Sequence, residues 1–404
     1  MSKVLFLSVP SHGNVNPTLG LVSELIKQGE DVIYFSSDEF RERIEATGAE
    51  FKCYSEDLDI FKNGGVPFGS MHRVLQSADK IIADILYQIK DLDYDFDYLI
   101  HSMAFPFAKV FAQILDIPAV SSLAIFAGLR QFIEKSTQPI DKMWPGSEEL
   151  METYQKVSQN IKNIYGVQLP ANILGLLMNK GDINLVYTSR LFSTDLDFFD
   201  DSYKFVGPPI YNREETVDFP FEKLEGKKVI YISLGTVFGS FSLDLYNTFF
   251  NSFSHPDTVV VLAAYKVDLS PYYIPDNFIV RNYVPQSELL KYTDVAITHA
   301  GMNSISDLVY NNVPFVAIPL GADQPLLAKR AEELGATIAL DVKNLSPQIL
   351  EDAVEKVLTD PSYRENIKMI NASFQQADGY KKAVEEIFKL KKEKGISFPY
   401  PVNS

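Results

Sequence analysis

The sequence has little of what disulfides and metal cages need. Cys53 is the only cysteine among 404 residues, so the chain can form neither an intrachain disulfide nor a cysteine-based metal site. Its five histidines are scattered, and none shows the HExxH spacing of a zinc protease. We therefore expect no metal centre in this protein.

Positive charge and long apolar runs are also scarce. The chain has 37 lysines and arginines against 53 aspartates and glutamates, a formal net charge of −16. A field of this sign repels nucleic acid and anionic membranes, so an anionic ligand has to be met by local donors. The apolar run near the N-terminus is broken at Pro10, too early for a signal peptide or a membrane span. We expect a cytoplasmic protein without a nucleic-acid partner and without stable membrane insertion.

The chain does have a regular alternation of short apolar strands and amphipathic helices, and its 46% of apolar residues is enough to fill two cores. The alternation lapses in a proline-rich stretch and then restarts. This pattern predicts an α/β protein with two Rossmann-like doubly wound domains that face each other across a cleft. The expected boundaries are a first domain over 1–205, a linker over 206–225, a second domain over 226–380 and a C-terminal helix over 381–404. The lysine cluster at 389–395 is expected to be a solvated helix end.

The first strand-to-helix turn reads "PSHGNVNPTLGL" over residues 10–21. The pattern predicts a strand over 4–9, an N-cap at Asn16 and Pro17 as the first helical residue. Turns of this kind carry chemistry in α/β enzymes. Asn14 at the bend nevertheless has an amide side chain, which neither takes nor gives a proton near neutral pH.

A second strand-to-helix turn has the character of an anion site. His299, Gly301, Asn303 and Ser304 cluster where a buried strand passes into a helix. A helix start offers free N–H groups and partial positive charge, and a glycine lets a phosphate approach the main chain. A further turn of the same predicted sheet supplies more donors, at Ser233, Gly235 and Thr236. Together the two turns favour a phosphate-bearing ligand.

The long segment that contains this turn resembles a known signature. The stretch "YVPQSELL", with "THAGMNSISDLVYNNVPFVAIPLGADQ" after it, resembles the nucleotide-sugar signature of the family 1 glycosyltransferases, closest to the bacterial macrolide and flavonoid enzymes. The N-terminal "VLFLSVPSHGNVNPTLGLVSELIKQGEDVIYFSSDEF" is similar to their first domain. The resemblance implies the GT-B fold, with the acceptor in the first domain, the nucleotide sugar in the second, and a C-terminal helix that returns to the first.

The resemblance also implies an activity. It is the inverting transfer of a hexose from a UDP-sugar, such as UDP-glucose, to a small hydrophobic acceptor. No cofactor is implied besides the donor substrate. No metal is expected for the diphosphate either, because helix-end dipoles and His299 can stabilise it and the chain has no DxD-like carboxylate pair there.

Carried over residue by residue, the resemblance assigns the donor site. Tyr283 and Val284 would lie against the uracil, with Gln286 near the ribose. Asp307 occupies the place of a glutamate that holds the ribose hydroxyls, and it is one methylene shorter.

The resemblance assigns the remaining donor contacts to the diphosphate and the sugar. His299 would donate to the diphosphate with Asn303 and Ser304 beside it. The pair Asp323 and Gln324 would hold hydroxyls of the transferred sugar, because a carboxylate next to an amide suits a polyol.

The catalytic dyad of the family is altered in this chain. Members carry a histidine that takes the acceptor proton and an aspartate that orients it. Here Asn14 stands in the histidine's place, and a gapless match puts Ser102 in the aspartate's place.

Three explanations remain open. In the first, His12 or His101 has taken over proton transfer, and His12 shares a side with Asn14 if the turn is extended. In the second, the acceptor is a phenol or a carboxylate that needs little help from a base. In the third, the chain is a weak or silent nucleotide-sugar-binding protein that acts as a partner or regulator.

The acceptor pocket is expected to be apolar. Aromatic and apolar side chains stand where the family lines this pocket, which suits a flavonoid, a macrolide or another phenolic. The candidate acceptor residues are Phe68, Met71, Phe105, Phe107, Phe126, Phe132 and Trp144. The natural acceptor, the sugar and the oligomeric state are left open by the sequence.

Overall fold

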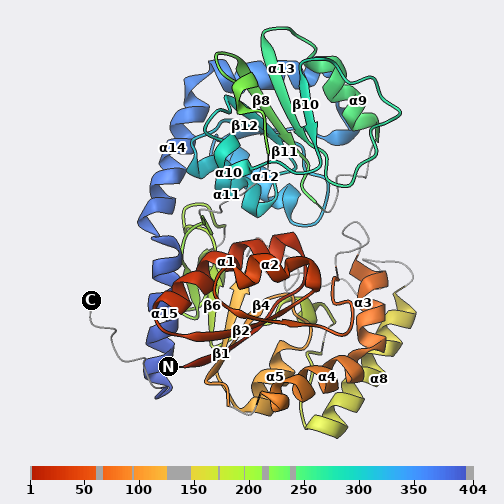
Figure 1. Ribbon diagram of the computed structural model, residues 1–404, viewed down its shortest axis with the longest axis vertical. Coiled ribbons are helices and arrows are strands. Elements are labelled where there is room, and N and C mark those ends of the chain that lie inside the picture. The colour runs from red at the N-terminus through yellow and green to blue at the C-terminus, as the bar shows by residue number, and fades with distance from the viewer. Residues whose placement is uncertain are drawn as a thin grey trace. The chain divides into compact units, whose positions relative to one another are not determined.

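The computed structural model describes residues 2–60, 67–92, 95–124, 147–171, 173–194, 196–211, 218–236 and 243–396. It divides the chain into two compact units, each built on its own sheet (Figure 1). Unit 1 comprises Met1–Tyr187, Asp195–Pro209 and Asp378–Ser404, and unit 2 comprises Thr188–Thr194 and Ile210–Ala377. The sequence did not indicate that residues 188–194 belong with the second half.

Unit 1 contains a seven-stranded parallel sheet in the order β3-β2-β1-β4-β5-β6-β7 within the described residues. Its strands are β1 Lys3–Leu7, β2 Asp31–Ser36, β3 Glu50–Cys53, β4 Tyr98–Ser102, β5 Ala119–Leu123, β6 Ile183–Val186 and β7 Tyr203–Phe205. Its helices are α1 His12–Lys27, α2 Arg41–Glu45, α3 Pro67–Gln76, α4 Ala78–Asp91, α5 Ala108–Leu115, α8 Glu148–Tyr165 and α15 Gly379–Glu393, with short 3-10 turns η1 Asp38–Phe40, η2 Ile173–Leu177 and η3 Leu196–Phe198.

Unit 2 contains a six-stranded parallel sheet in the order β10-β9-β8-β11-β12-β13, counted over the residues described there. Its strands are β8 Lys228–Ser233, β9 Thr258–Ala263, β10 Phe278–Arg281, β11 Val295–Thr298, β12 Phe315–Ala317 and β13 Thr337–Ala339. Its helices are α9 Leu243–Ser252, α10 Gln286–Leu289, α11 Met302–Tyr310, α12 Gln324–Glu333, α13 Pro347–Thr359 and α14 Pro361–Gln376, with 3-10 turns η4 Phe221–Lys223 and η5 Val342–Asn344.

Both sheets reverse their strand order at one point. In unit 1 the chain runs outward from β1 through β2 and β3, then starts again on the other side of β1 with β4. In unit 2 the same reversal lies between β8 and β11. Open α/β sheets bind ligands at the carboxyl ends of the strands on either side of such a reversal. The prediction of two Rossmann-like domains is confirmed, and the topology marks one candidate site in each unit.

The cores follow the alternation of the strands. In β8, Ile230 and Ile232 pack into a core cluster with Phe249 of α9 and Leu350 of α13. The side chain of Tyr231 therefore stands on the opposite face of the sheet, where its hydroxyl contacts Gln286 of α10.

The last helix packs on the first unit. Figure 1 shows α15 beside α1, and the hydroxyl of Tyr380 on α15 donates to the carbonyl of Pro17 on α1 at 2.7 Å. Lys391 near the end of α15 is 1% exposed and pairs with the buried Glu30 at 2.5 Å between Nζ and Oε1. The expectation that the lysines of 389–395 are all solvated is therefore wrong for Lys391, because this lysine has a buried carboxylate partner.

The first helix begins earlier than the sequence predicts. α1 starts at His12, after Ser11, and Pro17 lies inside it. Ser11 rather than Asn16 is the N-cap, because the carbonyl of Ser11 already accepts the backbone N–H groups of Asn14 and Val15. The prediction of an N-cap at Asn16 was wrong, since Pro17 is tolerated inside the helix here.

The described residues contain no helix that is long and apolar enough to cross a membrane.

Candidate functional site

The predicted donor residues of unit 2 gather at the carboxyl edge of its sheet. Ser233 ends β8, and His299 follows β11, the two strands on either side of the reversal. The backbone N–H of His299 donates to the carbonyl of Ser233 at 3.3 Å, which continues the β8–β11 pairing past the last regular residue. The two turns that the sequence singled out as donor-rich are thus joined directly.

The imidazole of His299 lies between two glycines. A Cβ on Gly235 would lie 2.6 Å from His299 Nε2, and a Cβ on Gly301 would lie 2.4 Å from the same atom. Both distances are far below a van der Waals contact, so any side chain at either position displaces the ring. Gly235 also has φ +73°, which a residue with a Cβ adopts only with strain. The two glycines therefore fix where the His299 ring can lie.

His299 is neutral at physiological pH. Burial lowers its pKa to about 4, against a smaller opposing effect from the backbone of Ser233. Nδ1 of the ring is buried without a hydrogen bond of ordinary geometry. A neutral imidazole in this place can donate one hydrogen bond to an anion without carrying a charge of its own.

The helix α11 begins directly after this ring. Gly301 is its N-cap in extended conformation, and Asn303 and Ser304 lie half-buried in the first turn. The nine-residue helix directs its first N–H groups and its positive dipole end toward the carboxyl edge of the sheet. This arrangement can hold a diphosphate.

Two turns at this edge contain alanines in the left-handed region. Ala300 has φ +62° between His299 and Gly301, and Ala322 has φ +53° directly before Asp323. A non-glycine residue held there costs of order 1 kcal/mol. Local strain of this size concentrates at binding sites, and both alanines here adjoin predicted donor residues.

The predicted ribose residues contact each other. Nε2 of Gln286 at the start of α10 donates to Oδ2 of Asp307 on α11 at 2.6 Å. Oε1 of Gln286 accepts a hydrogen bond from the hydroxyl of Tyr231 on β8 at 2.8 Å. Sequence reasoning paired Gln286 and Asp307 through the ribose but missed Tyr231. The strand alternation could have placed Tyr231 on this face, with Val229 and Ser233.

The two residues of the predicted sugar pair have different hydrogen-bonding capacity. Oε1 of Gln324 accepts the backbone N–H groups of Leu320 at 2.8 Å and Gly321 at 3.1 Å. Its NH₂ group is the part left for a ligand, so Gln324 serves as a donor. The neighbouring Asp323 is buried, 9% exposed, and its ionised carboxylate accepts only.

The remaining donor candidates lie on the same edge with different exposure. Tyr283 is half-buried after β10, and Val284 is buried. Thr236 is exposed in the loop after β8. The assignment of these residues to uracil and phosphate stays a prediction.

In unit 1 the position at which the sequence predicts a replaced base is occupied by a structural amide. Asn14 is buried, 5% exposed, in the first turn of α1, and its Nδ2 donates to Oγ of Ser11 at 2.8 Å. Ser102 at the end of β4 is also buried, and its Oγ accepts the backbone N–H of Val9 at 3.2 Å. The two side chains hold the β1–α1 turn in place, and neither can take a proton near neutral pH.

His101 is closed off from a ligand in this conformation. It is 1% exposed, and its Nδ1 lies 3.0 Å from the carbonyl oxygen of Ser102, to which it donates. Burial lowers its pKa to about 4, with the Ser102 backbone opposing this effect and Lys109 adding to it slightly. These features argue against His101 as a general base.

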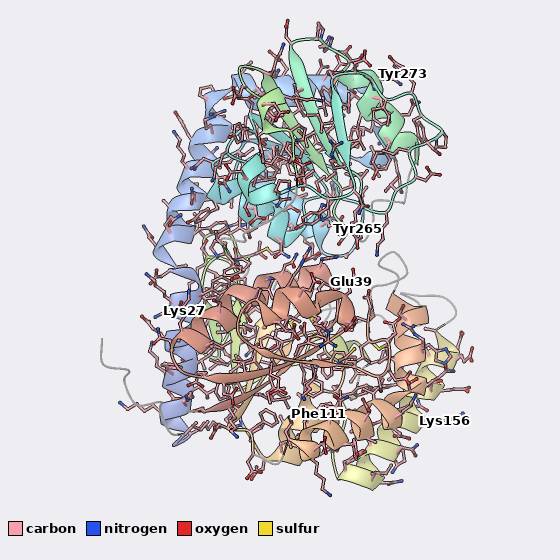
Figure 2. The ribbon with its side chains drawn as sticks, viewed as in Figure 1. Lys27, Glu39, Phe111, Lys156, Tyr265 and Tyr273 are labelled. Carbon is pink, nitrogen blue, oxygen red and sulfur yellow. The ribbon has the colours of Figure 1, made fainter. Side chains whose placement is uncertain are left out.

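The side chain of His12 points toward η1 and α2, whereas that of Asn14 points back to Ser11. Because α1 starts at His12, the two residues lie in one helical turn, about 200° apart around its axis. They do not share a side, contrary to the expectation for an extended turn. His12 Nε2 lies 3.5 Å from Oε1 of Glu39, and its Nδ1 lies 3.5 Å from Nη1 of Arg43 (Figure 2 labels Glu39).

Both nitrogens of His12 therefore have charged neighbours. A guanidinium only donates, so the lone pair of Nδ1 faces Arg43 and the N–H on Nε2 faces Glu39. His12 can take a proton from an acceptor only if Arg43 moves away from Nδ1. Sequence reasoning missed both partners, which come from the segment after β2 rather than from the turn.

The predicted acceptor side chains divide into two groups. Phe105 and Phe107 have no exposed surface, and Met71 is 3% exposed; all three belong to the hydrophobic core of unit 1. Their role as acceptor contacts stays a prediction. The side chain of Phe68 and the residues Phe126, Phe132 and Trp144 lie outside the described residues.

Among the described residues, no group of three or more histidines, cysteines, aspartates or glutamates is placed to hold a metal ion.

Known proteins are similar to this chain in sequence and in structure. The profile of a family described as "UDP-glucoronosyl and UDP-glucosyl transferase" matches residues 221–378, which contain the whole donor edge of unit 2. Two proteins of Bacillus subtilis (strain 168) are similar almost end to end. The uncharacterized UDP-glucosyltransferase YdhE is 36% identical over 401 residues, covering 98% of this chain and 100% of that protein. The uncharacterized UDP-glucosyltransferase YojK is 32% identical over 405 residues, covering 98% of each.

A solved structure agrees with these relatives. The glycotransferase of kitacinnamycin has a TM-score of 0.81 and 25% sequence identity to this chain, over 96% of this chain and 98% of its own.

Proposed function

The chain belongs to the UDP-glycosyltransferase family, and from this premise we propose that it transfers a hexose from a UDP-sugar to a small hydrophobic acceptor whose nucleophilic group is acidic. The protein is a glycosyltransferase with the GT-B fold that binds a nucleotide-sugar donor. The identity of the sugar, the class of acceptor and the roles of the residues are what we propose beyond this activity.

The diphosphate is proposed to lie at the start of α11. The glycines on either side of His299 and the helix start after Gly301 support this position. His299 donates one hydrogen bond to a diphosphate oxygen. As the leaving group gains charge in the transition state, this bond and the helix dipole strengthen, and that difference is what accelerates the reaction.

The sugar and the ribose are proposed to contact three side chains. Asp323 accepts from sugar hydroxyls while the amide group of Gln324 donates to one, so the two read a pattern of hydroxyls rather than a single one. Asp307 accepts from the ribose hydroxyls while Gln286 holds its Oδ2. An analogue that lacks these hydroxyls offers the two carboxylates no donors and is rejected for that reason.

The proposed acceptor class follows from one observation. The two side chains at the dyad positions, Asn14 and Ser102, are buried and hydrogen-bonded to the β1–α1 turn. An alcohol with an ordinary high pKa needs a base, whereas a phenol has a pKa of about 10 and a carboxylic acid is already ionised at neutral pH. The proposed step has the ionised acceptor oxygen, whose proton has passed to water, forming the bond to the anomeric carbon from the face opposite the diphosphate. The bond to the diphosphate breaks, and UDP leaves with the electron pair.

A series of acceptors tests this proposal. Phenols of one size with pKa from about 7 to about 10, one aliphatic alcohol of similar shape and one carboxylic acid are incubated with UDP-glucose, and UDP release is measured. We expect turnover with the ionisable acceptors, with the rate at fixed pH rising as the phenol pKa falls toward that pH. The aliphatic alcohol is expected to react at least about 100-fold more slowly, the usual contribution of a general base.

The double substitution Asn14→His with Ser102→Asp is the matched comparison, because it restores the family's dyad. It is expected to raise turnover of the aliphatic alcohol and to leave the most acidic phenol nearly unchanged. Equal turnover of alcohol and phenol by the unaltered protein would contradict the proposal and point to a base elsewhere in unit 1.

A further inference from the structure

The carboxylate of Asp307 is held by a chain of side-chain hydrogen bonds that begins inside the sheet. The hydroxyl of Tyr231 donates to Oε1 of Gln286 at 2.8 Å, and Nε2 of Gln286 donates to Oδ2 of Asp307 at 2.6 Å. The three residues come from β8, α10 and α11. A hydrogen bond to a carboxylate is shorter than one between neutral groups, and the second bond fits this pattern.

The hydroxyl of Tyr231 anchors the amide of Gln286 in the direction that Asp307 requires. An amide presents an oxygen on one side and an NH₂ on the other. While Tyr231 donates to the oxygen, the NH₂ is directed at the carboxylate. If the amide were turned over, its oxygen would face Asp307 Oδ2 and repel it. Because the carboxylate only accepts, it requires the NH₂ of Gln286, and the hydroxyl of Tyr231 then supplies the donor for Oε1; without that hydroxyl the amide oxygen would lose this partner and the amide would be held less firmly against Asp307.

Burial increases toward the sheet along this chain. Tyr231 is 4% exposed, whereas Gln286 and Asp307 are half-buried at the carboxyl edge. Asp307 and Asn303 are four residues apart on α11 and lie on one face of that helix. The row of hydrogen bonds therefore runs from a buried strand to the more exposed carboxyl edge of the sheet.

We infer that Tyr231 is a positioning residue for the donor, which acts through Gln286 to hold the Asp307 carboxylate where the ribose hydroxyls bind. This inference rests on the proposed function, because it takes Asp307 as the ribose contact. The aspartate is one methylene shorter than the glutamate of the family signature. Fixing it in advance lowers the conformational cost of the contact, and a short side chain anchored in this way does not need to swing toward the ribose.

Binding of two nucleotides tests the inference. The affinities of UDP and of 2′,3′-dideoxyuridine diphosphate, which lacks both ribose hydroxyls, are measured by calorimetry on the full chain. The ratio of the two affinities reports what the ribose hydroxyls contribute. Tyr231→Phe removes only the hydroxyl, and we expect it to lower this ratio about tenfold, the usual effect of one hydrogen bond. The affinity for the dideoxy nucleotide should change by less than twofold.

Matched variants separate positioning from a general structural effect. Tyr246→Phe removes the hydroxyl of another buried tyrosine of unit 2, on α9, and is expected to leave the ratio unchanged. Gln286→Leu interrupts the chain at its middle and should lower the ratio as Tyr231→Phe does. With UDP-glucose as substrate, Tyr231→Phe should raise KM about tenfold and change kcat by less than twofold.

The outcomes are distinguishable. If Tyr231→Phe weakens both nucleotides equally, the hydroxyl has only a structural role and the inference is overturned. If Asp307→Asn lowers the ratio but Tyr231→Phe does not, Asp307 reads the ribose without help from Tyr231, and only the positioning role is lost. If Asp307→Asn leaves the ratio unchanged, the ribose assignment itself is wrong and the inference falls with it. When Tyr231→Phe is combined with Asp307→Asn, we expect the ratio to fall no further than it does in Asp307→Asn alone.

Discussion

At the residue scale, two histidines are buried in their neutral form, one in each unit. Burial lowers the pKa of His101 and of His299 from the ordinary 6.5 to about 4. In an unfolded chain both would titrate near 6.5. Below that pH the unfolded state binds more protons than the folded state, so the free energy of unfolding falls as the pH drops from about 6.5. The stability that the two neutral histidines contribute at neutral pH is largely lost near pH 4.

The substitution His101→Asn isolates the contribution of one of these groups. Asparagine keeps an N–H that can donate to the Ser102 carbonyl but cannot titrate. Between pH 7 and pH 5 the variant should lose about 2 kcal/mol less unfolding free energy than the unaltered protein. Urea unfolding at the two pH values measures this difference. His255→Asn, which replaces an exposed histidine, is the control, and an unchanged acid dependence in His101→Asn would contradict the buried neutral assignment.

The pKa of His299 is also linked to donor binding. A diphosphate bound nearby would raise the pKa of this ring, because an anion stabilises the imidazolium. Gly235 and Gly301 leave room for the ring, because a Cβ at either position would lie within 2.6 Å of its Nε2. The residue that the sequence singled out for its type is therefore positioned by two residues that have no side chain.

At the scale of elements, the fold depends on how α15 is attached to the first unit. Gly20 on α1 faces Tyr380 on α15 so closely that a Cβ would lie 2.2 Å from the tyrosine ring. At the other end of α15, Lys391 pairs with Glu30, and the hydroxyl of Tyr98 donates to the second oxygen of that carboxylate at 2.9 Å. Both contacts are with the first unit, although α15 comes last in the chain.

Removing one partner of the buried ion pair is expected to be costly. Lys391→Met leaves the Glu30 carboxylate buried without its cation, which should lower the unfolding free energy by about 3–5 kcal/mol. Lys392→Met, at an exposed position on the same helix, should change it by less than about 0.5 kcal/mol.

Combining Lys391→Met with Glu30→Gln should recover most of the loss, because the amide still accepts from Tyr98 and no charge is left buried. Denaturant unfolding of the four proteins measures these values. Equal losses for Lys391→Met and Lys392→Met would show that the pair does not hold α15.

At the scale of the whole molecule, much of the fold follows from periodicity. The β-branched runs and helical spacings predicted two doubly wound sheets, and both are present with the strand reversal that marks a ligand site. The start of α1 was missed because Pro17 and Asn16 are good starting residues by local rules, while the tertiary context extends the helix back to His12.

The sites were predictable to a different extent. A motif confined to one segment, such as that around His299, can be read from the sequence because its residues lie in one strand-to-helix turn. Contacts between separate segments cannot be read in this way. Arg43 and Glu39 beside His12, Tyr231 behind Gln286 and Glu30 beneath Lys391 each join elements whose distance apart in space no local pattern encodes.

The central claim is that a UDP diphosphate binds at the start of α11 against the ring of His299. Calorimetric titration of UDP into the unaltered protein and into Gly301→Ala tests it most directly, with Met369→Ala at an exposed position on α14 as the control. A Cβ at Gly301 would lie 2.4 Å from His299 Nε2, so it must displace the ring and fill the approach to the main chain. We predict that UDP binds the unaltered protein and the control alike and binds Gly301→Ala at least about 100-fold more weakly, the loss of two charge-assisted contacts. Equal affinity in all three proteins would contradict the claim.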